Sequence, residues 1–200
     1  SNNFKFGENR KGDVKLLKKF ESIYGYQLLN IDPYKYLEST VSSTKIREYL
    51  KNGSIDLANK LLSRTWFIDG QVQEGKKIGR ALGYRTCNIK VKNYILPKPG
   101  IYAVKVSIGD KNKKYGGVSY LGTRPTFGGK ETFLETNIFG INKNFYKKKI
   151  TVYFLKFLRG DQKFKNSNQL IKQMNKDVIS AKKGLKTKLV TWVKQILIYL

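Results

Sequence analysis

Residues 100–121 read Gly-Ile-Tyr-Ala-Val-Lys-Val-Ser-Ile-Gly-Asp-Lys-Asn-Lys-Lys-Tyr-Gly-Gly-Val-Ser-Tyr-Leu. Apolar and polar side chains alternate on both sides of Gly-Asp-Lys-Asn at 109–112, which is typical of two antiparallel strands joined by a hairpin turn. Four other segments show the same two-residue period, and Gly-Gly at 128–129 and Asn-Lys-Asn at 142–144 predict further hairpin turns. We expect six strands, at 65–72, 87–91, 100–108, 115–121, 133–138 and 150–158. Six short strands predict a mainly β fold, a closed antiparallel barrel.

Helical patterns flank the strands on both sides. Ser43-Thr44 precedes a short amphipathic segment that Asn52-Gly53 stops, and Asp56 opens a second helix that ends near Arg64. After the strands, a period of three to four residues begins at Ser167, and we expect this C-terminal helix to cap the barrel. The expected domains are residues 1–64, a barrel with its helix at 65–187, and a helical tail at 188–200.

The composition points to anionic ligands and excludes histidine chemistry. The 200 residues carry a formal net charge of +26, of which +21 falls after Arg64. This charge indicates phosphates, nucleic acid or acidic lipid without choosing among them. The chain has no histidine, which excludes Ser-His and Cys-His nucleophile pairs and histidine-ligated zinc. A single cysteine and the lack of an apolar leader or of a run of ~20 apolar residues predict a cytoplasmic protein with no membrane partner.

Three segments after Arg64 carry candidate chemistry. Glu135 stands inside a strand, on the face that it shares with Phe133 and Asn137, where it is either a solvated rim carboxylate or a general base. Residues 75–88 hold three glycines among basic residues, followed by oxygen ligands suited to magnesium; an ordinary glycine-rich connection is the equal alternative. Residues 122–129 form a long polar loop just before the Glu135 strand. Together these segments supply what phosphoryl transfer needs, namely a phosphate cradle, magnesium ligands and a carboxylate.

The same segments resemble the motifs of riboflavin kinases, in the same order. Residues 79–88, Gly-Arg-Ala-Leu-Gly-Tyr-Arg-Thr-Cys-Asn, resemble the family signature Gly-Arg-x-Leu-Gly-Phe-Pro-Thr-Ala-Asn. Residues 97–102 resemble Pro-x-x-Gly-Val-Tyr, residues 122–127 the loop Gly-x-Arg-Pro-Thr-Phe, and residues 157–164 the late stretch Leu-Arg-x-x-x-Lys-Phe. Glu135 falls on the position of the family's catalytic glutamate.

The segment before Arg64 resembles the end of the FMN adenylyltransferase module that bacteria fuse ahead of this kinase. Residues 4–13 resemble its motif Phe-x-Phe-Gly-x-x-x-x-Gly-Asp, and residues 41–47 resemble Ile-Ser-Ser-Thr-x-Ile-Arg. The second motif contributes Ser42, Ser43, Thr44 and Arg47 as candidate site residues. The resemblance is thus to bifunctional riboflavin kinase and FAD synthetase, with a partly helical remnant of an α/β nucleotidyltransferase domain at 1–64.

The adenylyltransferase resemblance is incomplete. The early strand, the glycine loop and the His-x-Gly-His motif of that module have no counterpart in these 200 residues, which contain no histidine. We therefore expect that the purified chain does not form FAD from FMN and ATP. Chromatography after incubation with FMN, ATP and magnesium measures this, and FAD made by the pure chain would contradict the expectation.

The resemblance implies a kinase that moves the γ-phosphate of ATP to the ribityl 5'-hydroxyl of riboflavin, with FMN and ADP as products. It implies that Glu135 accepts the proton of that hydroxyl, and that Thr86 and Asn88 hold Mg²⁺ and ATP phosphate. The other implied ligand residues are Gly79, Arg80 and Gly83 for ATP and Arg124, Thr126 and Phe127 for the flavin. The implied fold is a six-stranded antiparallel barrel with a C-terminal helix.

The chain departs from the family pattern at five positions. Arg85 replaces the signature proline, Cys87 an alanine, Tyr120 a usual asparagine, Asn137 a common histidine and Gly140 an aspartate. Loss of the fixed φ of proline is expected to loosen the turn that presents Thr86, whereas the guanidinium adds positive charge for ATP. Weak activity or an altered substrate preference is the expected consequence.

Two other functions stay open. A basic barrel can bind nucleic acid by stacking bases on aromatic side chains, and the candidates are Tyr102, Tyr115, Tyr120, Phe127 and Phe133. The resemblance disfavours nucleic acid as the partner. The second alternative is a catalytically weak flavin-binding remnant, which the departures at Arg85 and Tyr120 allow.

Overall fold

The computed structural model describes residues 4–36, 39–75, 83–126 and 129–196; the side chains at 110–112, 124–126, 129–130 and 187–196 are not described. The chain divides into two compact units, Ser1–Ser43 and Thr44–Leu200. The division lies upstream of Arg64, because the two short helices that precede Arg64 pack with the barrel.

The first unit consists of short local elements. Strand β1 (Lys5–Phe6) pairs with β2 (Gly12–Asp13) across the 3-10 turn η1 (Glu8–Arg10), and β3 (Lys35–Tyr36) pairs with β4 (Ser39–Thr40). Helix α1 (Val14–Tyr24) begins where the Asp13 carboxylate accepts a hydrogen bond from the Leu16 N–H at 3.0 Å, and it ends at Gly25 with φ 67°. No residue of α1 is buried.

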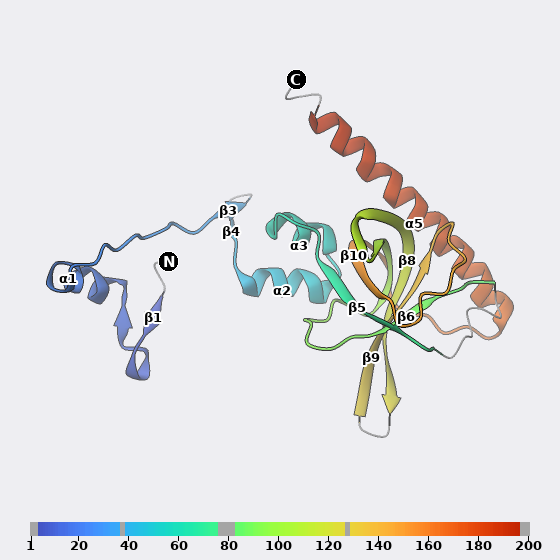
Figure 1. The fold of residues 1–200 in the computed structure, drawn as a ribbon, viewed down its shortest axis with the longest axis horizontal. Coiled ribbons are helices and arrows are strands. Elements are labelled where there is room, and N and C mark those ends of the chain that lie inside the picture. Colours follow the sequence, from blue (N-terminus) through green and yellow to red (C-terminus); the bar gives the residue numbers. More distant parts are fainter. Residues whose placement is uncertain (1–3, 37–38, 76–82, 127–128, 197–200) are drawn as a thin grey trace. The chain divides into compact units, whose positions relative to one another are not determined.

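The second unit is built on a closed six-stranded barrel (Figure 1). Its strands are β5 (Phe67–Gln73), β6 (Cys87–Lys90), β7 (Gly100–Ile108), β8 (Asp110–Thr126), β9 (Gly129–Ile138) and β10 (Lys149–Arg159). They close in the order β10-β5-β6-β9-β8-β7, and every pairing is antiparallel. The predicted barrel and its six strands are confirmed, although β8 and β9 extend further than the alternation indicated.

Alternate side chains of the strands fill the barrel interior. Val104, Val152 and Leu134 are fully buried, and an aromatic cluster closes one part of the core. In that cluster the Phe154 ring meets Trp66 and Tyr102 edge to face, with ring centroids 5.0 Å and 4.9 Å apart. Tyr102 is completely buried, so it is not available to stack a nucleic-acid base.

Two short helices, α2 (Ser43–Asn52) and α3 (Ile55–Leu61), add to this core through Leu50, Ile55 and Ala58. The Asn59 side chain joins α3 to the barrel: its amide donates to the Phe154 carbonyl at 2.8 Å and its oxygen accepts from the Trp66 N–H at 2.7 Å. The predicted helical hairpin is confirmed, but its second helix starts at Ile55, with Ser54 rather than Asp56 at the N-cap position.

A long C-terminal helix, α5 (Ser167–Ile196), lies along the outside of the barrel against β7, β8 and β10 (Figure 1). Ala181 is fully buried at this contact, and the Arg159 guanidinium of β10 reaches the Asp177 carboxylate of α5. The C-terminal helix is confirmed, whereas the tail expected at 188–200 continues α5 as far as Ile196. No helix in the described part of the chain combines the length and the apolar character that a membrane span needs.

The connection after β9 differs from the prediction. Asn-Lys-Asn at 142–144 was expected to form a hairpin turn, but β9 pairs with β6 and β8, and β10 pairs with β5 and β7. Residues 139–148 therefore cross from one strand to a non-neighbour. This crossing places them over the β5–β6 region, where the Lys147 N–H donates to the Val72 carbonyl at 2.9 Å.

Gly100 begins β7 with φ +145°, which L side chains rarely adopt. A Cβ there would overlap the Arg159 carbonyl oxygen and lie 3.0 Å from the Gly160 Cα. We expect Gly100→Ala to lower the free energy of unfolding by about 2–4 kcal/mol, because both the backbone conformation and the close approach to β10 forbid a side chain. Urea denaturation measures the change. Gly160→Ala is the matched control, since a Cβ at Gly160 meets nothing within 4 Å; equal stability of the two variants would contradict this account.

Candidate active site

Three side chains form a row across neighbouring strands on the outer face of the barrel. Glu135 of β9 lies directly opposite Asn88 of β6 on one side and Tyr120 of β8 on the other. Directly opposed residues of antiparallel strands point to the same face. Leu134 and Thr136 point into the barrel and are fully buried, so Glu135 points outward, where it is partly exposed. The carboxylate thus stands between an amide and a phenol.

Asn88 is the most unusual member of this row. Its side chain is buried, and its Oδ1 has no hydrogen-bond partner among the described residues. Gly75 leaves the room that the amide occupies, since a Cβ at Gly75 would come within 2.6 Å of the Asn88 Cγ. A buried acceptor without a partner costs about 1–3 kcal/mol. An amide oxygen kept in this state fits a site that a cation or a hydrogen-bond donor occupies.

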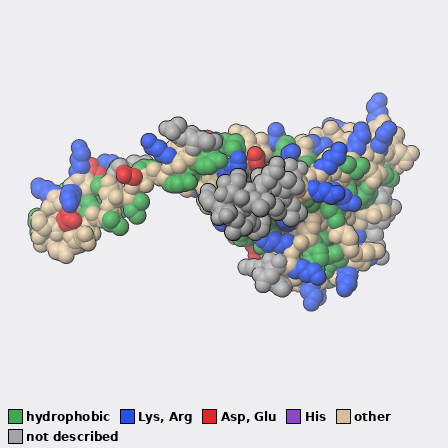
Figure 2. Space-filling view, turned by 90° about the horizontal axis from the view of Figure 1, so that it is seen from above, with side chains coloured by type: hydrophobic (Ala, Val, Ile, Leu, Met, Phe, Trp, Pro, Cys, Tyr) green, Lys and Arg blue, Asp and Glu red, His purple; other side chains and the backbone are tan. Residues whose placement is uncertain are grey.

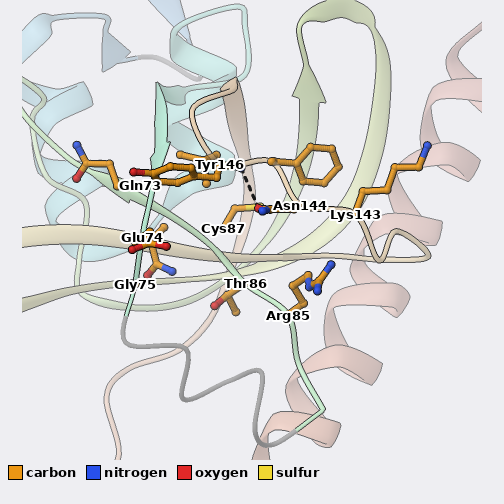
Figure 3. A pocket seen from close by; sticks show the side chains of 12 residues that line it. Gln73, Glu74, Gly75, Arg85, Thr86, Cys87, Lys143, Asn144 and Tyr146 are labelled. Carbon is orange, nitrogen blue, oxygen red and sulfur yellow. Dashed lines mark hydrogen bonds between the residues drawn. The ribbon is translucent and has the colours of Figure 1, made fainter.

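Asn88 borders a pocket of about 180 Å³ (Figure 3). The end of β5, the start of β6 and the crossing segment 139–148 enclose this pocket. Its lining residues are Val72, Gln73, Glu74, Gly75, Arg85, Thr86, Cys87, Asn88, Lys143, Asn144, Phe145 and Tyr146. Asn144 shapes the crossing segment, because its side-chain oxygen accepts from the Tyr146 N–H at 3.0 Å. The pocket therefore combines hydroxyl and amide oxygens with two basic side chains, one carboxylate and two aromatic rings.

Burial raises the pKa of the Cys87 thiol to about 11, and the charge of Arg85 opposes this rise. Cys87 is therefore a neutral thiol at pH 7. It points into the barrel side of β6 and contributes no charge to the pocket. The charged side chains that line the pocket are Arg85, Lys143 and Glu74.

On the other side of Glu135, the Tyr120 side chain lies near Arg159 and Asp161, at the end of β10. Burial raises the pKa of Tyr120, and the nearby carboxylates of Asp161 and Glu135 raise it further, while Arg159 opposes them. The Tyr120 ring meets Phe133 edge to face at 5.7 Å. Arg159 is fixed in turn by two guanidinium nitrogens that donate to Asp177, at 2.7–3.2 Å. On this side of Glu135, the aromatic rings of Tyr120 and Phe133 pack together, and hydrogen bonds to Asp177 hold Arg159 in place.

The sequence model of the riboflavin kinase family (Flavokinase) matches residues 62–185. The chain belongs to the riboflavin kinase family. It is 39% identical over 183 residues to the bifunctional riboflavin kinase/FMN adenylyltransferase of Buchnera aphidicola subsp. Schizaphis graminum, covering 90% of this chain and 58% of that protein. For the protein of the same description from Escherichia coli K12, the identity is 32% over 179 residues, covering 90% of this chain and 57% of the relative.

A solved structure described as a macrolide-efflux protein from Streptococcus pneumoniae is similar over 90% of this chain and 58% of its own, with 30% identity and a TM-score of 0.80. The chain thus spans a little under three fifths of the length of the relatives that it matches. The resemblance to riboflavin kinases, which rested on short motifs, is confirmed across most of the chain.

The structure places Thr86 and Asn88 in the lining of the first pocket, and Glu135, which lines neither pocket, lies directly opposite Asn88 on the neighbouring strand; the riboflavin kinase motifs single out all three residues. Gly83 lies at a second pocket beside the first. Arg124 and Thr126 lie in β8, opposite Glu131 and Gly129, and their side chains are outside the description; Gly79, Arg80 and Phe127 lie outside the described residues. Ser43, Thr44 and Arg47 lie on α2, directly after Ser42, and none of these four lines either pocket.

Sequence reasoning missed the crossing segment. Lys143, Asn144, Phe145 and Tyr146 line the first pocket, although this stretch was expected to be a simple turn. The available signal was its length, because about ten residues separate the two strands, more than a tight hairpin needs.

The surface does not favour nucleic acid. Of the aromatic residues considered for stacking, Tyr102 and Phe133 are buried, and Phe127 lies outside the described residues. In the view of Figure 2, lysine and arginine side chains are spread among uncharged ones over the barrel unit. A solvated lysine-rich surface accounts for this distribution.

Proposed function

We propose that this chain is a riboflavin kinase, which transfers the γ-phosphate of ATP to the 5'-hydroxyl of riboflavin and yields FMN and ADP. The observation that carries the proposal is the opposition of Glu135 and Asn88 across β6 and β9, at the edge of the pocket, in a chain that matches this family. A carboxylate directly opposite a residue that lines a polar pocket is an arrangement that suits phosphoryl transfer to an alcohol.

The pocket suits the phosphates of ATP together with Mg²⁺. Asn88 Oδ1, which is buried without a partner among the described residues, and the Thr86 hydroxyl are hard oxygen donors of the kind that Mg²⁺ binds. The described residues contain no group of three or more acidic or cysteine side chains that could hold a metal ion, so the phosphate oxygens of ATP would complete the coordination. When bound, Mg²⁺ neutralises charge on the phosphates. Gly79, Arg80 and Gly83 remain proposed ATP ligands.

Glu135 is the proposed general base. Its carboxylate would accept the proton of the 5'-hydroxyl as the hydroxyl oxygen forms a bond to the γ-phosphorus. The bond between the γ-phosphorus and the oxygen bridging to the β-phosphate breaks, and that oxygen leaves on ADP. Asn88 and Tyr120 lie directly opposite Glu135 on the two neighbouring strands, so the three side chains share one face of the sheet.

The flavin would lie on the Tyr120 side of Glu135. Arg124, Thr126 and Phe127 are its proposed ligands, carried by the long β8–β9 extension (Figure 1). The partly exposed Tyr120 ring, which packs edge to face on the buried Phe133, offers an aromatic surface near Glu135 that suits a planar ring system. With the ring system placed there, the ribityl chain of the flavin would extend toward Glu135.

The relatives named above carry an FMN adenylyltransferase activity in their descriptions. We infer that residues 1–64 derive from that module, with 65–187 as the kinase domain and 188–200 as its tail, and that Ser42, Ser43, Thr44 and Arg47 belong to the adenylyltransferase motif. A cytoplasmic location stays a prediction.

The direct test incubates the purified chain with riboflavin, ATP and magnesium chloride and separates the products by chromatography. FMN and ADP formed in equal amounts, and only when magnesium is present, would support the proposal. Riboflavin that stays unphosphorylated while it binds tightly would favour the flavin-binding alternative instead.

A further inference from the structure

The segment that leads into β6 is held to three different elements by side-chain hydrogen bonds. The Asn137 amide of β9 donates to the Arg85 carbonyl at 2.8 Å, and the Arg85 guanidinium donates to the Asn142 carbonyl of the crossing segment at 3.0 Å. Next to them, the Tyr84 hydroxyl donates to the Asn175 side chain of α5. We call the bonds that join Arg85, Asn137 and Asn142 the Arg85 clasp.

The clasp lies at the point where this chain lacks the signature proline. A proline at 85 would fix φ and would also restrict the residue before it. Arginine leaves both free, so other contacts must order the backbone that presents Thr86 and Asn88. Asn137 and the guanidinium provide those contacts, and Asn137 is itself a departure from the family pattern. Two departures from the family pattern therefore meet in one set of hydrogen bonds.

Arg85 also borders both cavities of this region. It lines the pocket of about 180 Å³ with Thr86 and Asn88, and it lines a second pocket of about 630 Å³ with Asn142 and Lys182. Figure 3 shows the Arg85 side chain beside Thr86 at the edge of the first pocket. The charge of Arg85 reaches the pocket wall, because it opposes the rise in the pKa of the Cys87 thiol. A cation held at this place attracts a polyphosphate.

We propose that Arg85 is a positioning residue for the nucleoside triphosphate: its clasp to Asn137 and Asn142 fixes the Thr86–Asn88 strand start against the crossing segment, so that the phosphate pocket is formed before ATP binds. This inference rests on the proposed function for the identity of the pocket's ligand. In this proposal Arg85 and Asn137 together position Thr86 and Asn88, which are the residues that would contact the phosphates and Mg²⁺.

Three variants test the clasp. Arg85→Gln removes the charged donor, Asn137→Ala removes the bond to the Arg85 carbonyl while keeping the charge, and the double variant removes both. We expect each single variant to raise the KM for ATP about tenfold and to change the KM for riboflavin less than about twofold. The double variant is expected to show about the same tenfold rise rather than the product of two, because both residues act on one segment. Arg85→Lys, which keeps the charge, should fall between wild type and Arg85→Gln.

Arg64→Gln is the matched control, because it removes an exposed arginine that stacks on Phe67 and lines neither pocket. Its KM for ATP should equal that of the wild type. Calorimetric titration with ADP and magnesium chloride gives a second readout that needs no turnover, and the thermal midpoint of each variant shows whether it is folded.

The outcomes separate this inference from the proposed function. An unchanged KM for ATP and an unchanged ADP affinity in Arg85→Gln, with FMN formed by the wild type, would overturn the clasp alone. An equal rise in both KM values would also overturn it, since that result marks a general distortion. Wild-type chain that binds ADP through Arg85 but forms no FMN would uphold the clasp and overturn the kinase proposal. Wild-type chain that binds no ADP would overturn both.

Discussion

Replacing Glu135 by glutamine is expected to lower kcat for FMN formation by about 10²–10⁴-fold, the usual contribution of a general base. Glutamine keeps the size and the polar character of the side chain but cannot accept the proton of the ribityl hydroxyl. Glu135 is part of the outward row on the barrel and not of its core, so the thermal midpoint should change little. The measurement is kcat and both KM values at saturating magnesium, with the thermal midpoint recorded in parallel.

Glu131 offers the matched control for this variant. It lies on the same strand and the same strand face, four residues away, and forms an ion pair with Lys90. Glu131→Gln should therefore retain kcat within about threefold, because a partly exposed ion pair at the protein surface is worth about 1 kcal/mol or less. Comparable losses in both variants would mean that the negative charge of the strand matters and not the position of Glu135.

Asn88→Leu is the second variant for which we expect a large effect. Leucine has nearly the shape of asparagine, but it removes the buried Oδ1 that has no partner among the described residues. We expect kcat/KM for ATP to fall by about 100-fold or more, because the substitution removes a proposed ligand of Mg²⁺ and the phosphates. We also expect the free energy of unfolding to stay equal or to rise by up to about 2 kcal/mol, since the cost of an unpaired buried acceptor disappears.

Asn59→Leu should show the opposite behaviour. Asn59 makes two hydrogen bonds that join α3 to the barrel, so its replacement leaves the Trp66 N–H and the Phe154 carbonyl without these partners. The expected result is a loss of about 2–4 kcal/mol in the free energy of unfolding with the KM for ATP unchanged. If Asn88→Leu destabilised the protein as strongly as Asn59→Leu, the Asn88 amide would have a structural role and not a ligand role.

The strands were predictable because each carries its own alternation of apolar and polar residues. Residues 100–121 contain the whole signal for a hairpin, and the observed pairing of Val106 with Tyr115 falls within it. The pairing of β10 with both β5 and β7 was not predictable from any local pattern, since it joins residues about eighty positions apart for β5 and about fifty positions apart for β7. The error at 142–144 follows from that, because the closure shows that β9 and β10 are not neighbours, and the only signal in the sequence was the length of the connection between them.

The same division applies to the candidate site. Residue type and spacing made Glu135 and the Thr86–Asn88 segment candidates, the resemblance to riboflavin kinases implied their roles, and the structure places Glu135 opposite Asn88 through strand register. The two hydrogen bonds around Arg85 join residues 57 and 52 positions apart, and the space for the Asn88 amide depends on Gly75 across the connection between β5 and β6. The local backbone preference of arginine in place of proline at 85 predicts a looser turn, and it gives no sign of the long-range hydrogen bonds that Arg85 makes in the structure.

The central claim is that this chain moves a phosphoryl group from ATP to a flavin hydroxyl next to Glu135. Its most direct test uses ATP radiolabelled at the γ-phosphate, with riboflavin and magnesium chloride, and compares wild type with Glu135→Gln. We predict that label enters FMN in an amount equal to the ADP formed by the wild type, and that this transfer is nearly lost in Glu135→Gln. Label released only as inorganic phosphate, or label in FMN at the same rate in both proteins, would contradict the account.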